Sequence, residues 1–261
     1  MRFKSVVPAI LLGIPIPESE NPFLVAPVAE AIVDVEFQRC PSPRISYEGV
    51  GGIEGLIQSF WLKLSKGLGL SLCSTLKLLE VETPSKPPRG GLYASLTATL
   101  LYALHRFHGD TVGVLDIVET SSLVDLADVD RSWGIAVEAL RYSAVAGKPV
   151  AYRGPLEVYE FEGRRGVRVE VLDYAGNLRS LVSRDSLGSS VYGALVHLMG
   201  EAVLEASMRI RDGAEVREAV ETLKPIHDAV ALAVYGLKPR GEKCLWSPGL
   251  PWSFDEVCIV E

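Results

Sequence analysis

The hydrophobic pattern predicts strands and one amphipathic helix in the first part of the chain. Residues 3–12 are mostly apolar, which is typical of a buried strand, and Gly13 follows them. The end of residues 23–37 alternates between apolar and polar positions, which is the two-residue period of a strand. Residues 53–66 place apolar side chains on one helical face and stop at Gly67, so they predict a helix.

The rest of the chain mixes further strands with longer helices. Residues 94–105 are apolar nearly all round, so we expect a helix at the centre of a domain. The other predicted elements are a strand at 76–81, a helix at 132–146, a hairpin of 156–162 and 167–172 turning at 163–166, helices at 190–211 and 214–235, and strands at 244–246 and 257–260. The change to a helix-rich half near 150–180 predicts two joined α+β lobes.

Composition narrows the class of protein. The chain has 261 residues, 48% of them hydrophobic, and this is enough to bury a sizeable core. No apolar run reaches the roughly 18 to 20 residues of a membrane span, so no membrane is expected as partner. The net charge of −7 argues against a nucleic-acid binder. It does not exclude a local phosphate site, and a homodimer is left open.

Cysteine and amide usage bear on the compartment and the source. The spacing of the four cysteines fits no zinc site or redox pair, and we interpret them as buried thiols of a reducing compartment. The apolar stretch after Arg2 and Lys4 resembles a secretion signal, but prolines interrupt it, so we predict a strand and a cytoplasmic protein. Asn and Gln occur only four times together, which indicates either a thermophilic, archaeon-like composition or ordinary drift.

The segment at 87–98, Pro-Pro-Arg-Gly-Gly-Leu-Tyr-Ala-Ser-Leu-Thr-Ala, carries the candidate chemistry. A strand precedes it and a buried helix follows, so glycine N–H groups at the helix start are placed to bind an anion. Arg89 adds a guanidinium, and Ser95 adds a hydroxyl in the first turns. A glycine-rich turn that only caps a core helix explains the same spacing, and neither a Walker loop nor a dinucleotide fingerprint is present.

This segment resembles the central phosphate-binding motif of the GHMP kinases, the galactose, homoserine, mevalonate and phosphomevalonate kinases. Pro87, Gly91, Leu92, Ser95 and Ala98 fall in or near matching places. The layout of 6–37 is similar to the opening strand, loop and second strand of the family. Residues 208–239 resemble its C-terminal helix pair, so the resemblance covers most of the chain in order.

The resemblance implies a two-lobed α+β fold, with a mixed-sheet lobe at 1–155 and a ferredoxin-like lobe at 156–261. It implies an ATP-dependent kinase that phosphorylates a hydroxyl of a small molecule. Arg89, Gly90, Gly91 and Ser95 would hold the ATP phosphates, and Ser95 would lie near Mg²⁺. Glu138 would be the catalytic base.

Departures from the family pattern keep other functions open. Tyr93 and Ala94 replace a motif glycine and serine, and the C-terminal glycine-rich loop retains only Gly249. The Asp that many family kinases use as base is missing. The alternatives are therefore an inactive GHMP-fold ligand-binding or regulatory protein, or a non-kinase enzyme on the same fold.

Several side chains have a structural interpretation beside the functional one. Glu138 and Arg141 lie three apart on one helical face, which fits a surface ion pair as well as a catalytic carboxylate. His227 is expected to be a packed or solvated histidine more often than a cleft residue. The aromatic, proline-containing loop at 246–254 is expected to pack against residues 87–91. Asp255 and Glu256 follow it as polar candidates at the cleft edge.

Overall fold

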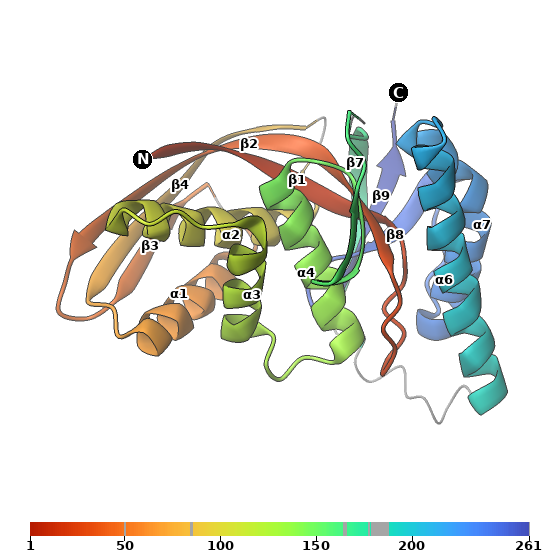
Figure 1. Cartoon of the computed structure of the whole chain (residues 1–261), viewed down its shortest axis with the longest axis horizontal. Helices are drawn as coiled ribbons and strands as arrows, with labels where there is room; N and C mark the ends of the chain where they lie inside the picture. The colour runs from red at the N-terminus through yellow and green to blue at the C-terminus, as the bar shows by residue number, and fades with distance from the viewer. Residues whose placement is uncertain (50, 84–85, 164–165, 177, 179–187, 261) are drawn as a thin grey trace.

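The computed structural model describes residues 1–49, 51–83, 86–163, 166–176, 178 and 188–260. A six-stranded sheet occupies the first part of the chain, and a three-stranded sheet forms with the C-terminal strands. Figure 1 shows helices beside the larger sheet and a pair of long helices, residues 189–211 and 216–235, at the other end of the molecule. Strands and helices thus mix in both parts, so the predicted α+β class is confirmed.

The larger sheet is organised by one long strand. β2 (Phe23–Arg39) pairs with β1 (Arg2–Leu12) along one edge, and its other edge pairs first with β5 and then with β4. The remaining strands are β3 (Arg44–Glu48), β4 (Leu72–Glu82), β5 (Val150–Gly154) and β6 (Glu157–Glu160). β3 runs parallel to β4 while the other pairs are antiparallel, so the sheet is mixed as expected.

Helices cover one face of this sheet. They are α1 (Glu54–Leu68), α2 (Arg89–His108), α3 (Val114–Asp125) and α4 (Arg131–Ala146) (Figure 1). α2 is buried from Gly90 to Leu101 and packs against β1 and α4, which confirms the prediction of a central helix. Its burial places the start of α2 deep inside the molecule.

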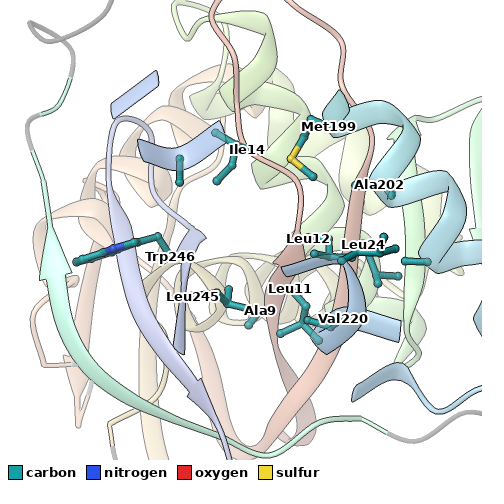
Figure 2. Packing of buried hydrophobic residues seen from close by; sticks show 14 of the residues in the cluster. Ala9, Leu11, Leu12, Ile14, Leu24, Met199, Ala202, Val220, Leu245 and Trp246 are labelled. Carbon is teal, nitrogen blue, oxygen red and sulfur yellow. The ribbon is translucent and has the colours of Figure 1, made fainter. Parts of the chain in front are cut away.

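The smaller sheet has the order β7 (Val169–Ala175), β9 (Phe254–Ile259) and β8 (Cys244–Pro248). It shares a hydrophobic core with β1, β2, α6 (Ser189–Arg211) and α7 (Val216–Tyr235). Figure 2 shows that core with Leu11, Leu12 and Leu24 near Met199, Ala202 and Val220. One continuous core therefore connects the two sheets.

Two parts of the sequence-based prediction differ from the structure. β3 and α3 lie in segments for which no strand or helix was predicted. The predicted hairpin of 156–162 and 167–172 is wrong, because β6 pairs with β5 and β7 pairs with β9. The predicted lobe boundary at residue 155 falls between β5 and β6, which are neighbours in one sheet. The local pattern gave the strands but not their partners.

The interpretation of the cysteines as free thiols is also wrong. Cys40 is bonded to Cys73, and Cys244 is bonded to Cys258. Cys244 and Cys258 are direct partners across β8 and β9, and Cys40 follows β2 where it runs beside Cys73 of β4. Sheet pairing brings these residues together over separations of 33 and 14 residues, which spacing alone does not reveal. Disulfides are typical of oxidising compartments and of hyperthermophile proteins, so they do not support the expected reducing compartment.

Within the described ranges, no helix combines the length and the apolar character needed to cross a bilayer.

Candidate functional site

Two glycines at the start of α2 lie between two backbone segments. A Cβ on Gly91 would lie 1.8 Å from the carbonyl oxygen of Pro8 in β1. A Cβ on Gly90 would lie 2.2 Å from Cα of Gly249, which follows β8. Only glycine allows both close approaches. The glycine pair thus packs the first turn of α2 against β1 on one side and the β8–β9 connection on the other.

The N-terminus of α2 is capped by a carboxylate from the other end of the chain. Pro88 occupies the N-cap position and gives no side-chain cap. Asp255 of β9 instead accepts a hydrogen bond from the Arg89 N–H at 2.9 Å, and the Gly90 N–H also bonds to it. These are donors that a helix leaves unpaired at its start, and the positive end of the helix dipole favours an anion there. Asp255 therefore occupies an anion site.

Burial dominates the electrostatics of this carboxylate. Asp255 is only 3% exposed, and burial raises its pKa to about 7. The Gly90 and Arg89 N–H groups and the charge of Arg89 act in the opposite direction and lower the pKa. The balance makes the charge on Asp255 sensitive to pH near neutrality.

The predicted phosphate-binding residues separate into two groups. The backbones of Arg89 and Gly90 meet at the Asp255 carboxylate, while the Arg89 guanidinium lies 4.0 Å from the ring centroid of Tyr174. Ser95 is fully buried beside β1, and its Oγ lies 2.6 Å from Oγ of Ser5. The Ser95 hydroxyl is thus engaged one turn further along α2, away from the donors that bind Asp255.

The segment between β8 and β9 forms a tight turn over the start of α2. The Gly249 N–H donates to the Ser253 carbonyl at 3.2 Å, and the Ser253 N–H donates to the Leu250 carbonyl at 3.0 Å. Trp252 has a left-handed backbone with a φ of 62°, and its ring lies 5.7 Å from that of Trp133. The expected packing of this loop against 87–91 is seen in the approach of Gly249 to Gly90.

Glu138 lies in a different environment. Its side chain is 13% exposed, 3.8 Å from the Arg131 guanidinium, and it accepts a hydrogen bond from the Tyr152 hydroxyl at 3.3 Å. Burial raises its pKa, and Arg131 lowers it. The side chain borders a cavity of about 360 Å³ lined by residues of 119–138, none of which belongs to α2. Neither the side chains that contact Glu138 nor the lining of this cavity includes a residue predicted to hold phosphate.

Arg141 does not pair with Glu138 at the surface. It is fully buried and forms a bidentate ion pair with Asp125, with distances of 2.9 and 2.5 Å. The Tyr93 hydroxyl donates to the same carboxylate at 2.5 Å. The tyrosine that replaces a motif glycine is therefore part of a buried polar cluster between α2, α3 and α4. Within the described residues, no group of metal-ligating side chains is assembled.

His227 is a packed histidine. It is fully buried in α7, and its Nε2 lies 3.0 Å from the Trp246 carbonyl oxygen, so Nε2 carries the proton. Burial lowers its pKa to about 4. The neutral ring fixes α7 to β8.

Sequence reasoning named Asp255 only as a polar group at the cleft edge. Its capping role had one detectable sign, because Pro88 leaves the start of a buried helix without a capping side chain. Such a helix needs an acceptor from elsewhere. The partner lies 166 residues away, and no local pattern identifies it.

Comparisons with known proteins relate the fold to solved structures. No family model matches the sequence, and no curated protein matches it. Methanococcus jannaschii mevalonate kinase has a TM-score of 0.67 and 9% identity, with 100% of this chain and 90% of that chain covered. Leishmania major mevalonate kinase, in complex with R-mevalonate, has a TM-score of 0.64 and 10% identity, with 100% of this chain and 87% of that chain covered.

A third structure is Streptococcus pneumoniae phosphomevalonate kinase in complex with phosphomevalonate and AMPPNP. It has a TM-score of 0.62 and 12% identity, with 100% of this chain and 93% of that chain covered. Identities this low carry the fold and not the activity. The chain therefore has the fold of the GHMP kinases over its whole length.

Proposed function

We propose that this chain is a small-molecule-binding protein with a kinase-like fold that does not transfer phosphate from ATP. The observation that carries the proposal is the Asp255 carboxylate at the start of α2. In the GHMP motif that residues 87–98 resemble, these N–H groups would face phosphate. A nucleotide phosphate at this position would compete with the buried Asp255 carboxyl group for the same N–H donors, and wherever that group is ionised the two anions would also repel each other.

The packing around Asp255 also supports the proposal. Gly249 lies against Gly90, so the backbone itself fills space beside the helix start. The Ser95 hydroxyl is engaged with Ser5 and is not free to approach a nucleotide-bound Mg²⁺. Glu138 lies among Arg131 and Tyr152, apart from α2. The residues that the resemblance assigns to ATP, Mg²⁺ and catalysis therefore do not fit those groups in this arrangement.

A kinase remains the second candidate, because S. pneumoniae phosphomevalonate kinase has a similar fold and was solved with AMPPNP. On that hypothesis the β8–β9 connection withdraws, Arg89 and Gly90 bind phosphate, Ser95 lies near Mg²⁺, and Glu138 is the base. Glu138→Gln would then abolish most of the turnover.

Phosphate transfer can be measured directly. The chain is incubated with ATP·Mg²⁺ and R-mevalonate, then with ATP·Mg²⁺ and phosphomevalonate, and ADP formation is followed. We expect no ADP above the protein-free control. ADP release that depends on either acceptor, and that Glu138→Gln removes, would contradict the proposal and favour the kinase.

A further inference from the structure

A groove of about 650 Å³ lies between the β5–β6 hairpin and α6, with the end of the β1–β2 loop at its edge. Its lining contains no residue of α2 or of the β8–β9 segment, so it is distinct from the site of Asp255. The volume is that of a site for a small organic ligand. We propose that this groove binds a small apolar amine that also carries an acceptor oxygen.

The walls of the groove present exposed apolar side chains. Leu156 at the tip of the hairpin is 97% exposed, and Tyr159, Leu204 and Met208 are each more than one-third exposed. These four residues come from the two elements that face each other across the groove. A ligand with an apolar body would remove their surface from water, which is favourable in proportion to the area covered.

The polar groups of the groove define the rest of the ligand. Arg153 is paired with Glu157 at 3.2 Å and donates to the Glu20 carbonyl at 2.9 Å. Arg211 is paired with Asp212 at 3.0 Å. Both guanidinium groups of the lining are thus neutralised by carboxylates of the chain, and an anionic ligand gains little from them.

Two of the lining carboxylates are paired, Glu20 with Arg131 at 3.4 Å and Glu157 with Arg153, so Glu201 is the one that remains. It lies on α6 within the lining, exposed to solvent, and it has no ion-pair partner in the described part of the chain. A ligand ammonium would provide the missing counter-charge. The ammonium would also be held one helical turn from His197, which lines the groove as well.

Asn21 is the reason why the ligand should carry an acceptor oxygen. Its side chain is 3% exposed and lines the groove, and its Nδ2 has no hydrogen-bond partner among the described residues. A buried amide donor without a partner is costly. A rotation of the Asn21 side chain would turn this buried Nδ2 toward the groove, where an ether or carbonyl oxygen of the ligand would satisfy it.

Gly200 lines the groove, and a larger side chain at this position would fill part of it. A Cβ built on Gly200 meets no atom within 4 Å, although the residue lines the groove. A leucine there fills ligand space without disturbing the fold. Gly193 lies on the same helix, is equally open, and does not line the groove, so Gly193→Leu is the matched control.

The ligand class is tested with defined probes and isothermal titration calorimetry. The first probe is para-methoxyphenethylamine, which has an aryl body, an ammonium and an ether oxygen. Its anionic counterpart is para-methoxyphenylpropionate, and para-ethylphenethylamine lacks only the oxygen. We expect the methoxy amine to bind at millimolar or lower concentration, and each of the other two to bind at least about tenfold more weakly.

Variants then locate the site. Gly200→Leu should abolish binding of the methoxy amine, and Gly193→Leu should leave its Kd unchanged. Glu201→Gln should weaken the amine by about tenfold, because it removes the counter-charge. Asn21→Ala should remove the advantage of the methoxy over the ethyl amine.

Three results would overturn the inference: no binding of the methoxy amine, equal or tighter binding of the propionate, or a Kd that Gly200→Leu does not change. The inference goes beyond the proposed function, because it concerns another site and another ligand. Phosphate transfer would therefore refute the proposed function without any loss of amine binding, and the two failures are distinguishable.

Discussion

At the scale of single residues, Asp255 gives the chain a pH-dependent stability with an unusual sign. Its pKa rises from 3.8 in the unfolded chain to about 7 in the folded protein. Between these values the folded state binds more protons, so the contribution of Asp255 to the free energy of unfolding falls as pH rises from about 4 to about 7. One group changes that free energy by at most about 1.4 kcal/mol per pH unit.

We predict that Asp255→Asn removes this dependence. The difference in unfolding free energy between wild type and variant should shift against the wild type as pH rises through this window, and level off above about pH 7. Urea unfolding at a series of pH values measures it. A difference that is constant across the window would show that the Asp255 pKa is not raised.

His227 makes the opposite contribution in an overlapping range. Its pKa falls from 6.5 to about 4 through burial, so the unfolded state binds more protons between these values. The stability that the neutral ring provides is therefore lost as pH falls from about 6.5 to about 4. We predict that His227→Gln makes the protein less sensitive to acid in this window. If His227→Gln loses as much unfolding free energy as the wild type between pH 6.5 and pH 4 in urea titrations, the lowered pKa of His227 is contradicted.

The sequence predicted the glycine pair at the start of a buried helix but not the carboxylate that caps it. Gly90, Gly91 and the apolar run that follows predict a helix N-terminus with free donors, because that chemistry is local. Asp255 joins this site only after β9 is placed beside β7 and β8. Ser95 was assigned to phosphate by its position in a motif, and its partner Ser5 comes from β1. In both cases the partner comes from a distant part of the chain, which a local sequence pattern does not show.

At the scale of elements, the contact of α2 with β1 depends on the absence of a side chain. We predict that Gly91→Ala destabilises the protein by more than about 1 kcal/mol, because its Cβ would overlap the Pro8 carbonyl. Gly193→Ala in α6 is the control, and it should stabilise by roughly 0.5 to 1 kcal/mol through helix propensity. Thermal unfolding followed by circular dichroism compares them. Equal effects would mean that α2 does not lie this close to β1.

The disulfides hold neighbouring strands of each sheet together. We predict that Cys40→Ser with Cys73→Ser lowers the free energy of unfolding by about 2 to 4 kcal/mol. Thiol titration of the denatured, unreduced wild-type protein should detect none of its four cysteines. Four reactive thiols would instead restore the interpretation of free cysteines.

Long periodic elements were predicted well, and strand partners were not. β1 and α2 follow from long apolar runs, because both are buried nearly all round, and β2 and the two C-terminal helices follow from their hydrophobic periodicity. β3 is short and mostly exposed, and Ile45 and Tyr47 are its only apolar residues, so its alternation is too brief to identify a strand. The expected hairpin around residue 163 was wrong because β6 and β7 belong to different sheets, and that choice is made by the packing of distant strands.

At the scale of the whole molecule, the chain combines a kinase-like fold with a helix start that is capped by its own carboxylate. Its full length superimposes on mevalonate and phosphomevalonate kinases at about one-tenth identity. The likeness lies in the arrangement of elements, whereas the start of α2 is closed by Asp255 and by the backbone of Gly249. The fold is shared, and the site decides the function.

On our proposal, the start of α2 holds the protein's own carboxylate in place of a nucleotide phosphate. A thermal-shift titration with ATP·Mg²⁺ at neutral pH tests this, with a mevalonate kinase of the same fold as positive control. We predict no change in Tm up to millimolar nucleotide. A Tm that rises with nucleotide concentration, as mass action requires of a ligand bound to the folded state, would contradict it.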